Sequence, residues 1–373
     1  TGMKKRIWLA AWLLASCLTL CSCGFSPMER QTFAICMSID LSAAQQLTVG
    51  IQAPKNGASE GDSGAGDYEV LTASGKTMAE ALALLAASTP YPINYCQLKL
   101  CLLSYELASK TELRPMLEEL EALPTMRPNA TVMIALGNAE QVMQSQKADF
   151  GMRLSTHLNL LLERLRGESM LPNSTLATVV RQLGDDFSDP LLCVCAVNAQ
   201  LLPKEKKPPS GSSGGEGSGG EGGGDSSTAA FALGEPWSTM LLPDGLLAGA
   251  LPRTGTNAVE YLGSAAVGNG RVSGVLTAKE TQLVLRALAK AKRKVAVNGG
   301  EAQLQLWLAG DQELLENSEA LTALVQKLQA LHCDALRFGE ACCTLFYTNA
   351  AWERFDFHHR YPTAAFVVNA SQN

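Results

Sequence analysis

Residues 33–40 read FAICMSID, at the centre of an apolar stretch that runs from Thr32 to Leu41. The segment that follows, Gln46–Ala53, alternates weakly between apolar and polar residues, and Tyr68–Ala73 resumes the pattern of a strand. Between them, Pro54–Asp67 is rich in Gly, Ser and Asp, which favour turns and loops. We therefore expect antiparallel strands joined by a flexible hairpin connection.

Helical and strand patterns both continue downstream, but they do not alternate regularly. Thr77–Ala87 is predicted to be a helix, because Thr77 and Glu80 have the spacing of a capping box. Further helices are expected over residues 111–120, 138–146, 152–166, 174–183, 278–292 and 313–331. Further strands are expected over 97–103, 130–136, 191–202, 229–233, 238–242, 302–308, 343–347 and 363–369. Residues 245–274 are glycine-rich and are expected to be irregular. This order predicts an α+β fold with mixed and antiparallel sheets flanked by helices, not a Rossmann fold.

Length and composition limit the classes of protein to consider. The chain has 373 residues and a mass of 39.6 kDa, with 46% apolar and 18% charged residues. This is enough apolar sequence for real cores and enough length for two or three domains. The formal net charge is −6, and no strongly basic domain stands out, which argues against a nucleic-acid-binding protein.

The first 22 residues have the order of a secretory signal peptide. A basic group, Lys4-Lys5-Arg6, precedes the uncharged apolar run Ile7–Leu20. That run is shorter than the roughly 20 residues that a membrane-spanning helix needs. No later segment is long and apolar enough to span, so we expect an exported chain that does not cross the membrane.

The end of this signal reads LCSC at residues 20–23, which fits the lipobox of bacterial lipoproteins. Cys23 is predicted to carry the lipid and to become the mature N-terminus. Cys17 fits the same pattern, but its use would leave an apolar run of only about ten residues. The alternative is an ordinary signal peptide with chance cysteines. Two or three acyl chains would hold the protein firmly on a membrane.

The remaining eight cysteines and the histidines show no reactive arrangement. None of these cysteines has Cys-x-x-Cys spacing, and most lie in apolar runs such as LLCVCA at 191–196. There Cys193 and Cys195 share one face of a strand, so small buried residues are expected. Residues 332–334 read His-Cys-Asp, but adjacent side chains point in different directions. We predict no catalytic, cofactor-binding or metal-binding residue, and no cofactor.

Several motif matches fail on their context. The GxGxxG at 215–220 and the GxSxG at 211–215 lie in a glycine tract, without the flanking strand and helix that either motif requires. Gly75-Lys76-Thr77 resembles the end of a phosphate-binding loop but lacks its earlier glycine. Lys290–Lys294 reads as the basic last turn of a helix, which complements the helix dipole.

The order of short motifs over roughly 340 residues resembles the Ger(x)C family, the lipoprotein C subunits of bacterial spore germinant receptors. The resemblance begins at Cys23 and continues through 33–40, where the family has an "ALGID"-like strand. The other matching positions are Gly75–Ala81, Leu103–Ala108, Arg127, Gly137, Ala139, Phe231, Leu246–Leu251, Gln329, Asp334, Phe338-Gly339 and Trp352. The glycine tract is an addition to the family pattern.

This resemblance implies a fold of three α+β domains and a non-enzymatic role. The chain would sit on the outer face of the spore inner membrane and act with A- and B-type membrane subunits, and contact with a small-molecule germinant could be indirect. The expected division is a signal peptide at 1–22 and domains at 23–145, 146–260 and 261–373. The middle domain would contain a disordered glycine-rich loop at 204–228, inserted between neighbouring strands.

Two other function classes, a solute-binding lipoprotein and an envelope hydrolase, would each require their own sequence features. A solute-binding lipoprotein of a transporter would show two similar lobes around one polar cleft, and the sequence has no internal duplication. An envelope hydrolase would need a nucleophile with a histidine and an acid, or a set of metal ligands.

Overall fold

The structure is a computed structural model. It describes residues 8, 12, 30–55, 68–148, 152–185, 187–201, 241–255, 257–298, 301–309 and 311–371.

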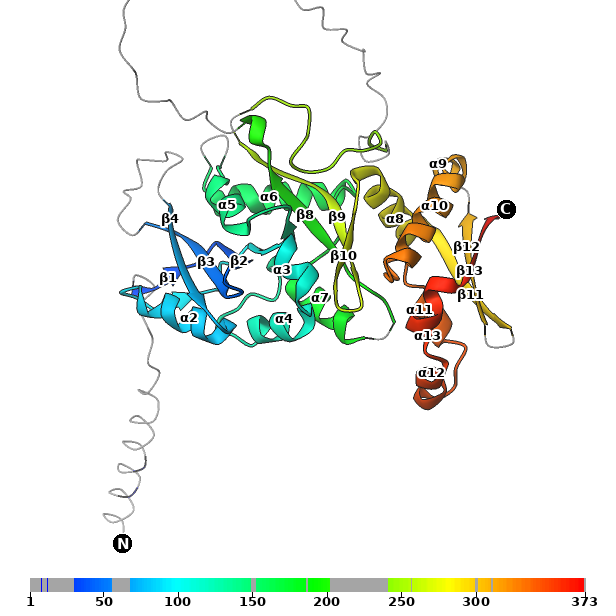
Figure 1. The fold of residues 1–373 in the computed structure, drawn as a ribbon, viewed down its shortest axis with the longest axis horizontal. Coiled ribbons are helices and arrows are strands. Elements are labelled where there is room, and N and C mark those ends of the chain that lie inside the picture. Colours follow the sequence, from blue (N-terminus) through cyan, green and yellow to red (C-terminus); the bar gives the residue numbers. More distant parts are fainter. Residues whose placement is uncertain are drawn as a thin grey trace, which may run out of the picture.

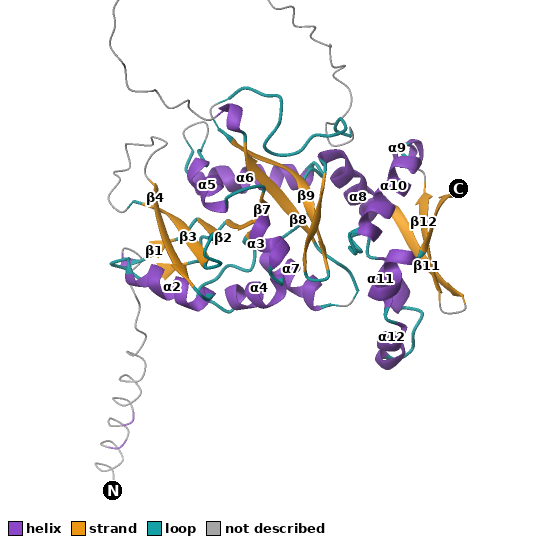
Figure 2. Cartoon of the chain, viewed as in Figure 1, coloured by secondary structure: helices purple, strands orange, loops and turns teal. Residues whose placement is uncertain are grey.

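An eight-stranded mixed sheet organises the described chain as far as residue 276 (Figures 1 and 2). The strand order is β10-β9-β8-β7-β6-β2-β3-β4; neighbours from β8 to β2 run parallel and the outer pairs run antiparallel. The strands are β2 (Cys36–Leu41), β3 (Leu47–Pro54), β4 (Tyr68–Gly75), β6 (Leu100–Ser104), β7 (Thr131–Ala135), β8 (Leu191–Val197), β9 (Val259–Gly268) and β10 (Arg271–Leu276). The predicted antiparallel arrangement of the first three is confirmed. A short parallel pair, β1 (Thr32–Phe33) and β5 (Ile93–Asn94), lies beside the sheet.

Alternation along the central strands builds a core on each face of this sheet. In β6, Cys101 and Leu103 face one core, whereas Leu100 and Leu102 face the other. The first core is covered by α2 (Met78–Ala87), α3 (Tyr105–Lys110), α4 (Leu113–Glu121) and α7 (Leu176–Gly184). The second is covered by α5 (Ala139–Ser145) and α6 (Leu154–Gly167). The predicted α+β fold with mixed sheets flanked by helices is therefore confirmed.

Local capping explains where these helices begin. The Thr77 hydroxyl accepts from the Glu80 amide at 3.2 Å, and the Glu80 carboxylate accepts from the Lys76 amide at 2.7 Å. This differs slightly from the predicted capping box, in which Glu80 would accept from Thr77. At α5 the carboxylate of Asp40, from the end of β2, accepts from Ala139 and Glu140 at 2.8 and 3.0 Å.

The expectation that the glycine-rich residues 245–274 are irregular holds for the described residues before Val259 and is wrong from Val259 onward. β9 and β10 form an antiparallel hairpin, and β9 also pairs along β8. The glycines stand where backbones approach closely: a Cβ on Gly263, whose φ is +93°, would lie 2.8 Å from the Leu276 carbonyl. Gly263, Gly268 and Gly274 thus meet packing constraints of the hairpin, whereas Gly245, Gly249 and Gly255 lie in the irregular segment before β9.

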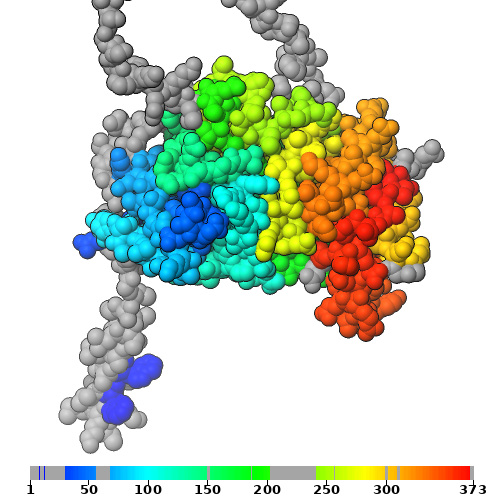
Figure 3. Space-filling model, viewed as in Figure 1, coloured from blue at the N-terminus to red at the C-terminus, as the bar shows by residue number. Residues whose placement is uncertain are grey.

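The C-terminal part packs helices on a three-stranded sheet of its own, at the end of the molecule coloured orange and red in Figure 3. β12 (Glu301–Ala309) pairs antiparallel with β11 (Ala291–Asn298) and parallel with β13 (Ala365–Ser371). The helical elements are α8 (Ala278–Lys290), α9 (Gln312–Glu316), α10 (Ser318–Ala330), α11 (Phe338–Cys343), α12 (Asn349–Phe355), α13 (Phe357–Arg360) and the 3-10 turn η4 (Tyr361–Thr363). A second 3-10 turn, η2 (Ala199–Leu201), follows β8.

Three predictions for this part are wrong. The helix expected over 278–292 ends at Lys290, and the basic residues beyond it lie on β11, where Lys294 stacks over Trp307 at 4.8 Å. The helix expected over 313–331 is broken at Asn317 into α9 and α10. The strand expected over 343–347 is instead the end of α11 and a turn, and Phe346 packs against Trp352 and Phe355.

The two parts meet along a close contact. Gly268 and Gly274 of the hairpin lie against Leu331, and a Cβ on Gly268 would collide with the Leu331 carbonyl oxygen. The Asp334 amide donates to the Asp189 carboxylate at 2.8 Å. Phe187 packs on Trp352 with ring centroids 5.7 Å apart.

The predicted domain boundaries at 145/146 and 260/261 do not coincide with breaks in the large sheet. Strands from all three predicted domains belong to it, and β9 spans the second boundary. The apolar cores instead group most residues up to 276 around this sheet and most later residues around the small one, although Leu191, Ala266 and Leu276 of the large sheet pack into the C-terminal core. The three-domain division stays a prediction of the sequence, which limited proteolysis can test.

Candidate functional site

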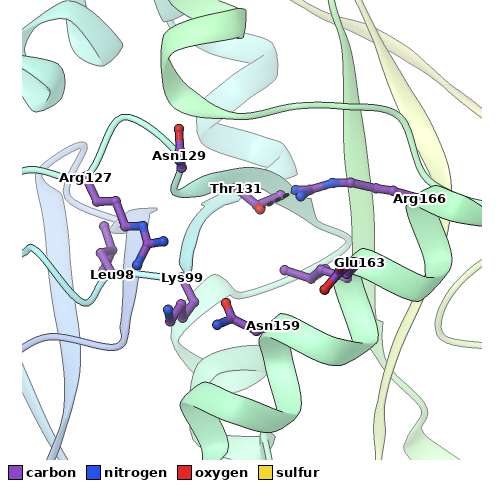
Figure 4. Close-up of a pocket in the computed structure, with 9 residues that line it drawn as sticks. Leu98, Lys99, Arg127, Asn129, Thr131, Asn159, Glu163 and Arg166 are labelled. Atoms are coloured by element: carbon purple, nitrogen blue, oxygen red, sulfur yellow. Dashed lines mark hydrogen bonds between the residues drawn. The ribbon is translucent and has the colours of Figure 1, made fainter.

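A cavity of about 350 Å³ opens at the amino ends of the neighbouring parallel strands β6 and β7 (Figure 4). Its lining comes from three places: the residues just before β6, the residues leading into β7, and one face of α6. The lining residues are Leu98, Lys99, Arg127, Asn129, Thr131, Asn159, Leu162, Glu163 and Arg166. We call this cavity the cationic pocket, because three of its charged residues are basic and one is acidic.

Helix periodicity explains the contribution of α6. Asn159, Glu163 and Arg166 are spaced by four and three residues, so they share one face of the helix. Leu162, on the same side, is buried in the core against the sheet. Burial of the apolar residue thus directs the neighbouring polar residues toward the rim of the cavity.

Lys99 is fixed by the backbone on both sides. Its amide donates to the Ile35 carbonyl at 2.7 Å, and its carbonyl accepts from the Thr131 amide at 2.8 Å. The residue is only 8% exposed. Burial, and next the positive charge of Arg127, lower the pKa of the Lys99 ammonium.

Arg166 reaches across the cavity from α6. Its guanidinium donates to the Thr131 hydroxyl, while its Nε is buried and finds no acceptor among the described residues. Figure 4 shows Arg127 and Lys99 on one side of Thr131 and Arg166 on the other. Within the described residues, none of these three cations forms an ion pair, and Lys99 and Arg127 make no side-chain hydrogen bond.

The sequence alone does not indicate this pocket. Lys99 and Arg166 are 67 positions apart and belong to no spaced motif. Arg127 stands out in the sequence only as a position that matches the family pattern. A lysine next to an apolar strand is the one local signal, and it is weak, because the same pattern occurs wherever a strand begins.

The prediction that the chain has no metal cluster stays a prediction for the residues that the structure does not describe. Among the described residues, no three His, Cys, Asp or Glu residues stand close enough to hold a metal ion. In the triplet 332–334, His332 is exposed whereas Cys333 and Asp334 are buried, so these side chains do diverge.

All eight described cysteines are free thiols, and six of them are buried as predicted. Cys193 and Cys195 share the core beneath α5 and α6. Burial raises the pKa of the Cys193 thiol to about 11, which keeps it protonated and unreactive. Cys96 is exposed, and Cys343 is half-buried.

Comparison with known proteins finds a family match in the N-terminal part of the chain. Residues 25–197 match the family described as "Spore germination protein N-terminal domain". This match covers just under half of the chain and supports the Ger(x)C resemblance. The chain is also similar to the solved structure entitled "Crystal Structure of the GerBC protein", with 13% identity, a TM-score of 0.42, and coverage of 90% of this chain and 95% of that one. The comparison with curated proteins gives no match.

Several residues that carry the Ger(x)C resemblance stabilise the fold through hydrogen bonds or close packing. Asp334 accepts from the amides of Phe338 and Gly339 at 3.0 and 2.7 Å and so caps α11. Gln329 donates to the carbonyls of Tyr361 and Ala364, which ties α10 to the segment before β13. Gly75 leaves room for α2, because a Cβ there would lie 2.6 Å from the Ala81 nitrogen.

Cys23, the predicted lipidation site, lies outside the described residues, as do the signal peptide and the glycine-rich loop at 204–228. The strand predicted at 229–233, with Phe231, and the one at 238–242 begin in the same undescribed stretch. Within the described residues, no helix combines the length and the apolar character needed to cross a membrane.

Proposed function

We propose that this chain is the lipid-anchored C subunit of a spore nutrient germinant receptor. It would act on the outer face of the spore inner membrane with A- and B-type membrane subunits to trigger germination. The single observation that carries this proposal is the family match over residues 25–197. Its start, two residues after Cys23, is consistent with a mature chain that begins at Cys23.

A short tether would then set the orientation of the protein. Nine positions separate Cys23 from Thr32, the start of β1. A fully extended chain of that length spans about 30 Å. The tether would hold the end of the molecule that carries β1 and α2 near the membrane; the three-stranded sheet lies at the opposite end (Figure 1).

The anchor is tested by fractionating cells that express Cys23→Ala. We expect the variant to leave the membrane fraction, whereas Cys96→Ala, which removes an exposed thiol elsewhere, stays in it. If Cys23→Ala remains bound after detergent-free washing, the anchor assignment is wrong. Release by Cys17→Ala instead would move the anchor to Cys17.

The receptor role is tested in spores of a strain that lacks its other nutrient receptors. Deleting this gene should abolish germination with the remaining nutrient, and a plasmid copy should restore it. Affinity purification of the tagged chain from spore membranes should recover two multi-spanning proteins. Normal germination of the deletion strain with every nutrient would refute the role.

The second hypothesis, a solute-binding lipoprotein of a transporter, draws no support from the position of the cationic pocket. All of its lining residues fall within 98–166, and they surround one edge of a single sheet and one helix. A binding protein of that class holds its solute between two lobes. The receptor subunit therefore remains the proposal.

A further inference from the structure

The three basic residues of the cationic pocket form no ion pair among the described residues, unlike some other half-buried basic residues of this protein. Two other half-buried arginines have carboxylate partners: Arg253 pairs with Glu260 at 2.8 Å, and Arg286 pairs with Asp311 at 3.0 Å. A third, Arg293, donates to the Leu288 carbonyl at 3.2 Å. Lys99, Arg127 and Arg166 have no such partner within the described residues. A buried cation without an opposite charge is unfavourable, so this arrangement calls for a compensating anion.

The chemistry of the lining matches that need. Lys99 offers a compact ammonium, and Arg127 and Arg166 offer planar guanidinium groups that suit carboxylate and phosphate oxygens. Thr131 and Asn159 add neutral hydrogen-bonding groups, and Leu98 and Leu162 add apolar surface. A cavity of about 350 Å³ lies at the small end of the range for small-molecule sites.

The single carboxylate, Glu163, narrows the choice of ligand. It lies on the exposed side of the pocket, one helical turn from Asn159 and from Arg166. A negative charge at the rim would repel an extended polyanion, whereas one oxyanion group can sit among the three cations. The site therefore fits a ligand with one compact oxyanion.

We propose that the cationic pocket binds a small molecule through a carboxylate or phosphate group, held by Lys99, Arg127 and Arg166. This proposal does not rest on the receptor role, because it follows from the charges and the cavity alone. The oxyanion can come from a free metabolite or from a lipid headgroup, and the test below separates the two sources.

Binding is measured by isothermal titration calorimetry on the full chain purified in a neutral detergent. The probes are inorganic phosphate, succinate and acetate, each against sodium chloride of equal ionic strength. A parallel sedimentation assay uses vesicles of phosphatidylcholine with and without phosphatidylglycerol. We expect saturable 1:1 binding of at least one probe. Binding only to vesicles with phosphatidylglycerol would identify the lipid headgroup as the source.

Three variants make the result specific. Lys99→Met keeps the buried aliphatic stem and removes the charge, and Arg127→Gln removes a second cation. Each substitution should raise the dissociation constant of the ligand at least tenfold. Lys292→Gln, on the exposed side of β11, removes a charge outside the pocket and should bind as the unchanged chain does.

A second readout separates a ligand site from a merely structural lysine. Because Lys99 faces Arg127 without a carboxylate, Lys99→Met should raise the melting temperature of the ligand-free protein and abolish the rise caused by ligand. Lack of saturable binding by every probe would overturn the proposal. Unchanged binding by Lys99→Met would overturn it as well.

Discussion

At the scale of single residues, buried carboxylates hold this fold together by accepting backbone hydrogen bonds. Asp40 caps α5 and Asp334 caps α11, each with two amide donors. Glu260 on β9 accepts from the amides of Gly249 and Leu251. For Glu260, whose pKa is lowered, these are charge-assisted hydrogen bonds, which are roughly twice as strong as neutral ones. Such residues look like candidates for catalysis in a sequence, but here their lone pairs are occupied.

Asp334 should make stability depend on pH. Burial is the main reason why the pKa of its carboxyl is raised from 3.8 to about 7, against the lowering effect of two amide donors. Because the folded pKa lies above the unfolded one, folding takes up a proton between them. The resulting stability is fully present below about pH 4 and is lost as the pH rises through about 7.

Urea unfolding at pH 5 and pH 8 measures this effect. The full shift in pKa corresponds to about 4 kcal/mol, of which about 3 kcal/mol is expected between pH 5 and pH 8. Asp334→Asn should be less stable at both values but should lose much less between them than the unchanged chain. Asp244→Asn, at an exposed position, should keep the original difference. Equal pH differences in all three proteins would contradict the assignment.

Glu260 should anchor the segment before β9. Burial disfavours its ionised form, but bonds from Asn198, Leu251, Gly249 and Arg253 outweigh that effect, and the pKa of the Glu260 carboxyl is lowered. Glu260→Gln turns a side-chain NH₂ toward amide donors and should cost about 2–4 kcal/mol in the free energy of unfolding. Faster hydrogen exchange at the Gly249 and Leu251 amides should accompany the loss. Glu121→Gln, at an exposed helix end, should be neutral, and slow exchange at both amides in Glu260→Gln would refute this role.

At the scale of elements, the β9–β10 hairpin shows how glycine can mislead. Composition alone makes 245–274 look like loop, because glycine is depleted in strands. In the fold, Gly268 and Gly274 are strand residues that allow the C-terminal part to approach. Their small size is a requirement of a contact with Leu331, which is more than 50 positions away in the chain.

This contact predicts a graded cost for added methyl groups. Gly268→Ala meets the rigid backbone of Leu331 and should lower the free energy of unfolding by about 3 kcal/mol. Gly274→Ala meets only the Leu331 side chain, at 2.7 Å, which can move, so about 1 kcal/mol is expected. Gly167→Ala, at the end of α6 with open space around it, should be neutral or slightly stabilising. Denaturant titration ranks the three variants, and a larger loss for Gly274→Ala than for Gly268→Ala would show that the contact is misplaced.

At the scale of the whole molecule, the pairing of β8 with β9 explains how a long insertion is tolerated. Val197 pairs with Val259, so the chain leaves the sheet and returns to it at the same edge. A connection between fixed ends costs only about 0.6 kcal/mol for each doubling of its length. The tract lies in the connection between β8 and β9, but it and the strand predicted to follow it at 229–233 lie outside the described residues, so the loop insertion stays a prediction.

Replacing residues 208–227 by a tight turn should therefore leave the fold intact. We expect the melting temperature to change by no more than about 3 °C and membrane attachment to be unaffected. Calorimetry and fractionation measure the two properties. A drop of 10 °C or more would assign the tract a structural role.

Much of the fold could be predicted because it depends on local periodicity. Helix α2, with its Thr77 cap, and the strands β2, β3, β4 and β7 follow from patterns that span fewer than a dozen residues each. Two of the failures, at 343–347 and in the β9–β10 hairpin, arise where distant contacts override local preference. Residues 343–347 look like a strand, but Phe346 is drawn into an aromatic cluster with Trp352 and Phe355.

The cationic pocket could not be predicted for a related reason. Lys99, Arg127 and Arg166 are individually ordinary, and they meet only because β6 and β7 are neighbours and α6 packs across their amino ends. No local pattern in the sequence indicates that these three residues lie close together.

The sequence by itself determined the mixed α+β character and the family resemblance, and it led to the predictions of an export signal and of a lipobox at Cys23. All of these reside in short runs of residues whose chemistry acts locally. The tertiary structure alone decided the sheet order, the contact of Gly268 with Leu331 and the gathering of three cations that form no ion pair among the described residues. Those features depend on strand pairing and helix packing between segments tens of residues apart, which the free energy of the whole fold selects.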